Sequence, residues 1–167
     1  MGDIFIFRDI DLITIVRVFL AFVLGGVVGF ERERVRRPAG LRTHMLVCAG
    51  AACFTVASVY GFEGFGTNRD PARLAAQIIT GIGFLGAGTI FRTGSTVRGL
   101  TTASSIWVTA SIGIVIGLGM FWLALFTTAF TWFTLTVIKN AEMRRGNGTA
   151  VSAGEPSIGS APNDDLD

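Results

Sequence analysis

Long apolar stretches alternate with short charged segments along most of this 167-residue chain. Five apolar stretches can be recognised, at about residues 12–30, 43–62, 74–91, 101–116 and 120–138. A helix needs roughly 20 mostly apolar residues to cross a bilayer, and these stretches come close to that length. The pattern therefore predicts an all-α fold, a polytopic membrane protein with about five transmembrane helices that contact the lipid bilayer.

Basic residues gather in three of the charged segments, at 31–42, 92–99 and 139–145. The segment 63–73 has balanced charge. Arginine and lysine are enriched in loops on the cytoplasmic side, so we expect the N-terminus outside and the C-terminus inside. We expect residues 1–141 to form the transmembrane domain. Residues 142–167 are rich in Gly, Ser, Pro, Ala and Asp, which predicts a disordered cytoplasmic tail.

Glycines cluster in two of the apolar stretches. In the first stretch, steps of four residues place Arg17 and Ala21 on one helix face with Gly25 and Gly29, which have the GxxxG spacing of closely packed helices. The third stretch concentrates its glycines within eight positions, at Gly81, Gly83, Gly86 and Gly88. Two interpretations stay open for that stretch: close helix packing, or a locally broken helix that exposes backbone groups to a ligand.

Acidic residues are scarce in the apolar stretches, and none occurs between Asp70 and Glu142. The glycine spacing at 81–86 therefore lacks the acidic residue, and the preceding strand, that a dinucleotide site needs. A dedicated Mg²⁺ site usually uses carboxylates, whereas arginines and hydroxyls suit an anionic or zwitterionic small solute. The candidate ligand-binding residues are Arg17, Glu31, Arg32, Arg42, Gln77, Arg98, Thr101, Thr102 and Ser105.

Several candidates also have a purely structural interpretation. Arg17 can extend to the nearby membrane surface, and the arginines of residues 31–42 can serve topology and lipid-headgroup contact. His44 lacks partners for a metal site, so a helix-cap or interface role is preferred. No nucleophile–base pair, carboxylate dyad or metal cluster is recognisable, and we expect no enzyme, cofactor, metal or nucleic-acid partner.

Five short motifs follow one another along the chain: GFERE at 29–33, PAGLRTH at 38–44, RLAAQ at 73–77, GIGFLGAG at 81–88 and VRGLTTA at 97–103. Together they resemble the MgtC/SapB family of membrane proteins. The resemblance implies a multi-pass protein of the bacterial inner membrane, linked to growth in low magnesium and to virulence, without enzymatic activity. Many members carry an ACT-like C-terminal domain, which the polar tail of this chain does not resemble.

Two functions stay open at this point. One is a small transporter that works as a homodimer, because one copy has few helices to enclose a pathway. The glycine faces of the first and third stretches would then pack between copies. The alternative is a regulatory protein without transport of its own that binds another membrane complex, for which the resemblance suggests the F-type ATP synthase.

Overall fold

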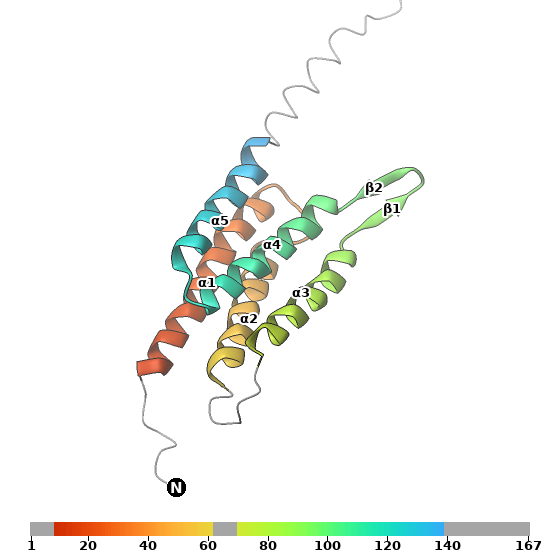
Figure 1. The fold of residues 1–167 in the computed structure, drawn as a ribbon. Helices are drawn as coiled ribbons and strands as arrows, with labels where there is room; N and C mark the ends of the chain where they lie inside the picture. Colours follow the sequence, from red (N-terminus) through yellow and green to blue (C-terminus); the bar gives the residue numbers. More distant parts are fainter. Residues whose placement is uncertain (1–8, 62–69, 139–167) are drawn as a thin grey trace, which may run out of the picture.

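The computed structural model of the protein describes residues 9–61 and 70–138, which form five α-helices and one β-hairpin. The elements are α1 (Asp9–Arg34), α2 (Leu41–Tyr60), α3 (Pro71–Ala87), β1 (Phe91–Thr93), β2 (Thr96–Arg98), α4 (Leu100–Gly117), α5 (Phe121–Phe133) and a π-helical segment η1 (Thr134–Ile138). Successive helices run in opposite directions, so the α1–α2 turn and the hairpin lie at the same end of the bundle, here called the hairpin end (Figure 1). The predicted tail at 142–167 lies outside the described residues.

Each predicted apolar stretch contains a helix, which confirms the all-α class. Within the described residues, three helices are long and apolar enough to cross a membrane, over Leu12–Arg34, Leu41–Tyr60 and Leu100–Gly117. Two shorter apolar helical stretches cover Ala75–Ala87 and Phe121–Val137. The length and composition of these helices fit a helical membrane protein, and the number of crossings stays a prediction.

The third helix ends earlier than the sequence pattern predicts. We expected it to continue to about Phe91, but α3 stops at Ala87 and the chain turns into the hairpin. Thr89 helps to end the helix, because its hydroxyl donates to the Gly86 carbonyl at 2.8 Å. The hairpin turns at Gly94, whose φ of 62° is left-handed. Its strands pair Phe91 with Arg98 in antiparallel register.

Close glycine contacts hold the centre of the bundle, where α2 packs against both α1 and α4. A side-chain carbon added at Gly25 would lie 2.6 Å from the His44 carbonyl oxygen, and one at Gly29 would lie 2.8 Å from the backbone of α2. One added at Gly113 of α4 would lie 2.8 Å from the Ala51 side chain. The helices thus approach each other closely where glycine removes the side chain. The glycine face of the first predicted span is occupied within the chain itself.

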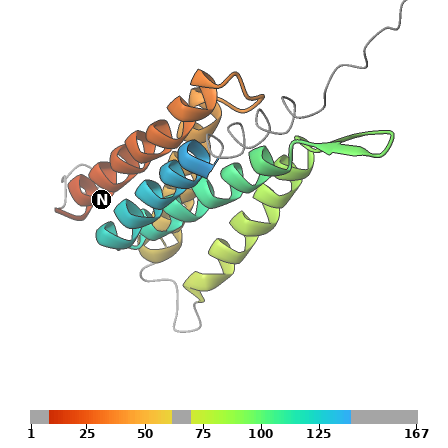
Figure 2. The same ribbon diagram turned by 90° about the horizontal axis from the view of Figure 1, so that it is seen from above.

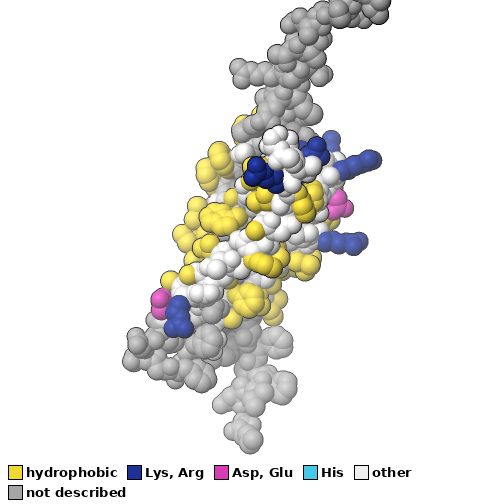
Figure 3. Space-filling model, turned by 90° about the vertical axis from the view of Figure 1, so that its right-hand side faces the viewer, with side chains coloured by type: hydrophobic (Ala, Val, Ile, Leu, Met, Phe, Trp, Pro, Cys, Tyr) yellow, Lys and Arg dark blue, Asp and Glu magenta, His cyan; other side chains and the backbone are white. Residues whose placement is uncertain are grey.

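The outer surface is strongly apolar. Exposed large hydrophobic side chains cover α1 and α5, whereas α5 buries only Ala124, Thr128 and Thr131 in its α-helical part. On the face seen in Figure 3, charged side chains lie toward the two ends and hydrophobic groups lie between them. This distribution suits a helical bundle surrounded by lipid. The last apolar stretch presents most of its aromatic side chains outward.

Candidate ligand-binding site

A buried polar cluster lies at the hairpin end, where α1, α2 and α4 meet. Arg32 is 2% exposed, and its Nη2 donates to the Thr102 hydroxyl at 2.9 Å. Thr102 is buried as well. An arginine inside a membrane bundle is costly unless polar groups or water surround it. The structure therefore brings together two of the predicted site residues that lie 70 positions apart in the chain.

His44 connects the same cluster to α2. Its Nδ1 lies 2.9 Å from the Gly40 carbonyl oxygen, and its Nε2 lies 3.1 Å from the Ser105 hydroxyl. A carbonyl oxygen only accepts, so Nδ1 carries a hydrogen and donates it. The Ser105 hydroxyl also lies 2.8 Å from the Thr102 carbonyl oxygen. The Ser105 hydroxyl has one hydrogen, which it can donate either to His44 Nε2 or to the Thr102 carbonyl oxygen. The two hydrogen bonds are therefore coupled.

Glu31 and Arg32 leave polar atoms unused in this region. Glu31 is 6% exposed, and one of its carboxylate oxygens, Oε2, is buried without a hydrogen-bond partner among the described residues. Arg32 Nε is buried and unpartnered in the same sense. Buried polar groups in proteins are usually hydrogen-bonded, and an exception calls for an explanation such as a ligand or water. Two adjacent residues of α1 thus present one unpartnered acceptor atom and one unpartnered donor atom among the described residues.

Arg17 occupies the opposite end of the bundle. Its Nη1 donates to the Tyr60 hydroxyl at 3.0 Å and to the Gly117 carbonyl oxygen at 2.9 Å, and its guanidinium lies 5.6 Å from the centre of the Tyr60 ring. Arg17 therefore ties together the ends of α1, α2 and α4. At 1.5 Å per helical residue it lies about 22 Å along α1 from Arg32. One small ligand cannot contact both.

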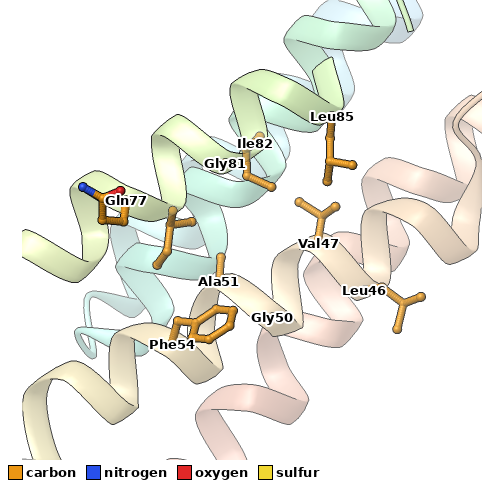
Figure 4. A pocket seen from close by; sticks show the side chains of 10 residues that line it. Leu46, Val47, Gly50, Ala51, Phe54, Gln77, Gly81, Ile82 and Leu85 are labelled. Carbon is orange, nitrogen blue, oxygen red and sulfur yellow. The ribbon is translucent and has the colours of Figure 1, made fainter. Parts of the chain in front are cut away.

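Gln77 lies elsewhere again, on the α3 wall of an apolar groove between α2 and α3. The groove has a volume of about 620 Å³ and is lined by residues including Phe54 and Leu85. Figure 4 shows Gln77 at one end of this groove, apart from the Leu85 side chain at the other. Helix α3 continues unbroken through its glycines. Gly81 and Gly83 face open space, with no described atom within 4 Å of an added side-chain carbon.

The remaining predicted residues lie on the surface of the hairpin end. Arg42 and Thr101 are exposed in the first turns of α2 and α4, and Arg98 is exposed on β2. Gly86 is buried against Ala103 of α4. The nine candidates therefore fall into four places: the buried cluster, this surface, the α2–α3 groove and the opposite end. The described glycines of α3 do not line the Arg32 cluster.

Three residues with defined contacts were not among the sequence-based candidates. His44 lies inside the cluster, which agrees with the interface role preferred for it. Tyr60 holds Arg17. Glu33 accepts from the Leu41 amide at 2.8 Å and so caps α2 across the turn. The sequence offers one sign of this capping role: Glu33 is an acidic residue that precedes a Pro-x-Gly turn and the helix that follows it.

The fold and the cluster together define an all-α membrane protein with charged and polar groups buried inside its helical bundle. Residues 18–144 match the model of the MgtC family, and the chain belongs to that family. It is 43% identical over 137 residues to the Escherichia coli K12 protein named "Putative magnesium transporter YhiD". The matched residues make up 80% of this chain and 64% of the relative. No solved structure matches significantly.

Two further relatives carry the family's own name. Protein MgtC of Brucella abortus strain 2308 is 50% identical over 112 residues, which is 66% of this chain and 44% of the relative. Protein MgtC of Salmonella typhimurium strain 14028s is 44% identical over 131 residues, which is 78% of this chain and 54% of the relative. The chain thus spans less than two thirds of the length of these relatives. Neither the family nor these names indicate an enzyme.

Proposed function

We propose that the protein is a small transporter-like membrane protein that binds an anionic or zwitterionic solute at the Arg32 cluster. The observation that carries the proposal is the pair of adjacent buried residues, Glu31 and Arg32, each with an unpartnered polar atom among the described residues. Buried ionisable groups within membrane helices commonly mark solute or ion pathways. The name of YhiD supports a transport role for this chain.

The donors of the cluster favour a negatively charged group on the solute over a bare Mg²⁺ ion. A guanidinium repels a cation and binds oxyanions through several N–H groups. Divalent hard cations are usually held by several carboxylate or carbonyl oxygens. Glu31, the buried acidic neighbour of Arg32 in α1, can accept from a protonated or ammonium group of the solute. A link to growth in low magnesium would then be indirect.

We further place the chain in a bacterial inner membrane with five crossings, N-terminus outside and C-terminus inside. The arginines of the α1–α2 turn and of the hairpin then share the cytoplasmic side. We also propose that two copies of the chain form a homodimer by packing their α3 helices together. Gln77 and Gly81 are exposed on α3, and an amide that faces lipid is costly unless a second helix supplies its hydrogen bonds.

Solute flux into proteoliposomes tests the proposal. Purified protein is reconstituted, and uptake of small anionic and zwitterionic solutes is measured with and without a gradient. We expect solutes of one of these two classes to enter. Thr102→Val should reduce their uptake at least several-fold, because it removes the hydroxyl that accepts the hydrogen bond from Arg32. Ser104→Ala is the matched control, since Ser104 is exposed and its hydroxyl donates only to the Leu100 carbonyl. Absence of flux for every solute of both classes would exclude the transport function.

A further inference from the structure

The N-terminus of α4 presents hydrogen-bond donors at the hairpin end. Gly99 precedes the helix with a left-handed φ of 93°, no side chain caps the first turn, and that turn contains no acidic residue. The first amides of a helix lack acceptors within it and lie at the positive end of its dipole. Helix N-termini of this kind bind anions when further groups complete the site.

Arg32 is the second, independent feature of this place. Its guanidinium reaches the same first turn, since Nη2 donates to the Thr102 hydroxyl, and its buried Nε has no partner among the described residues. The Thr102 hydroxyl accepts this bond and keeps its own hydrogen to donate. An oxyanion at the start of α4 would therefore meet amide, hydroxyl and guanidinium donors together.

The start of α4 combines buried and exposed residues. Arg32 and Thr102 are at most 3% exposed, whereas Leu100 is 56% exposed and Thr101 is exposed. The first turn of α4 thus carries a buried polar side chain next to exposed ones at the hairpin end. The exposed strand residue Arg98 shortly precedes this turn in the chain.

Glu31 selects among oxyanions. Its buried Oε2 has no donor among the described residues, and a carboxylate beside an anion is unfavourable unless a hydrogen lies between them. Phosphate keeps at least one hydrogen at neutral pH and can donate it to Glu31, whereas sulfate and phosphodiesters have none. Resting on the proposed function, we infer that the solute group bound here is a hydrogen phosphate, held by Arg32 and the start of α4 and recognised by Glu31.

Calorimetric titration of the full chain, purified in a phosphate-free glycoside detergent, tests this assignment. Inorganic phosphate should bind, and sulfate at equal ionic strength should bind about tenfold or more weakly, because it cannot donate to Glu31. Arg32→Lys keeps the positive charge but loses the planar guanidinium, which can donate two parallel hydrogen bonds to an oxyanion. We expect this substitution to weaken phosphate binding about tenfold or more. Arg34→Lys, an exposed neighbour in the same helix turn, should bind like the unmodified protein.

We expect Glu31→Gln to lose the preference for phosphate over sulfate. If Glu31 only stabilised the fold, the substitution would leave this preference unchanged. Should Arg32→Lys fail to fold, thermal unfolding of the unmodified protein still decides, since a ligand that binds the folded state raises Tm by more the higher its concentration relative to its Kd. Equal stabilisation by phosphate and sulfate, or none by phosphate, would overturn the assignment. Binding of a zwitterion such as glycine without phosphate would also overturn it, while leaving the proposed transport function standing.

Discussion

Ser104 and Ser105 are sequence neighbours on α4 with opposite surroundings. Ser105 is 3% exposed and lies 3.1 Å from His44 Nε2, whereas Ser104 is exposed and bonds to its own helix. We expect Ser105→Ala to lower the free energy of unfolding by about 1–3 kcal/mol, because it leaves a buried ring nitrogen unpaired. Ser104→Ala should change it by less than about 0.5 kcal/mol. Thermal unfolding in detergent measures both, and equal effects would mean that the His44 contact contributes nothing.

Individual side-chain roles were only partly predictable. The sequence placed Arg17 on a helix-contact face, and the structure confirms that Ala21 and Gly25 on that face are buried. The partners of Arg17 lie 43 and 100 residues further along the chain. Helical periodicity relates residues three and four apart, so it carries no information on such distant contacts.

At the scale of elements, the two glycine-rich helices differ in what their glycines do. An alanine at Gly113 of α4 would collide with the Cys48 carbonyl and the Ala51 side chain of α2. Gly81 of α3 has no described atom within 4 Å of the same added carbon. We expect Gly113→Ala to destabilise the protein by about 1–3 kcal/mol through overpacking.

Gly81→Ala is the matched substitution on α3. In the monomer this substitution should leave the free energy of unfolding unchanged or raise it by up to about 1 kcal/mol, because alanine favours the helix more than glycine does. The free energy of unfolding of both variants can be measured in detergent, where copies can be kept apart by dilution. A loss at Gly81 equal to that at Gly113 would show that α3 packs differently from the structure described.

Helix faces were the most predictable feature. Thr102, Ser105 and Thr109 recur at helical spacing along the fourth stretch, and all three are buried in the bundle. The hairpin was expected only as a basic turn, since its three-residue strands are too short for an alternating pattern to be recognised. The π-helical end of α5 was not expected. Its first residue, Thr134, donates to the Phe130 carbonyl oxygen at 2.9 Å, a contact that can perturb a helix.

At the scale of the whole molecule, the two ends of the bundle are chemically different. At one end Arg17 Nη1 donates to Tyr60 and Gly117, and its buried Nε has no partner and no unpartnered acidic oxygen beside it among the described residues. At the hairpin end Arg32 keeps a free donor beside Glu31. The outer face of α3, shown apart from α1 and α5 in Figure 2, is the least covered helical surface. The proposed site at the hairpin end and the exposed face of α3 are the two features on which the proposal of a small carrier that works with a second copy depends.

The arrangement of the whole chain in the membrane can be tested by thiol labelling. In a variant with Cys48 and Cys53 replaced by alanine, single cysteines are introduced at Arg36, Arg98 and Ala72. Arg36 and Arg98 belong to the hairpin end, and Ala72 lies in the first turn of α3 at the other end (Figure 1). We expect an impermeant reagent to label Ala72→Cys in intact cells and the other two only after permeabilisation, because basic segments stay in the cytoplasm. Labelling of Arg36→Cys and Arg98→Cys from opposite sides would place the two halves of the Arg32 cluster across the membrane from each other, and neither the cluster nor the solute site proposed in it could then exist.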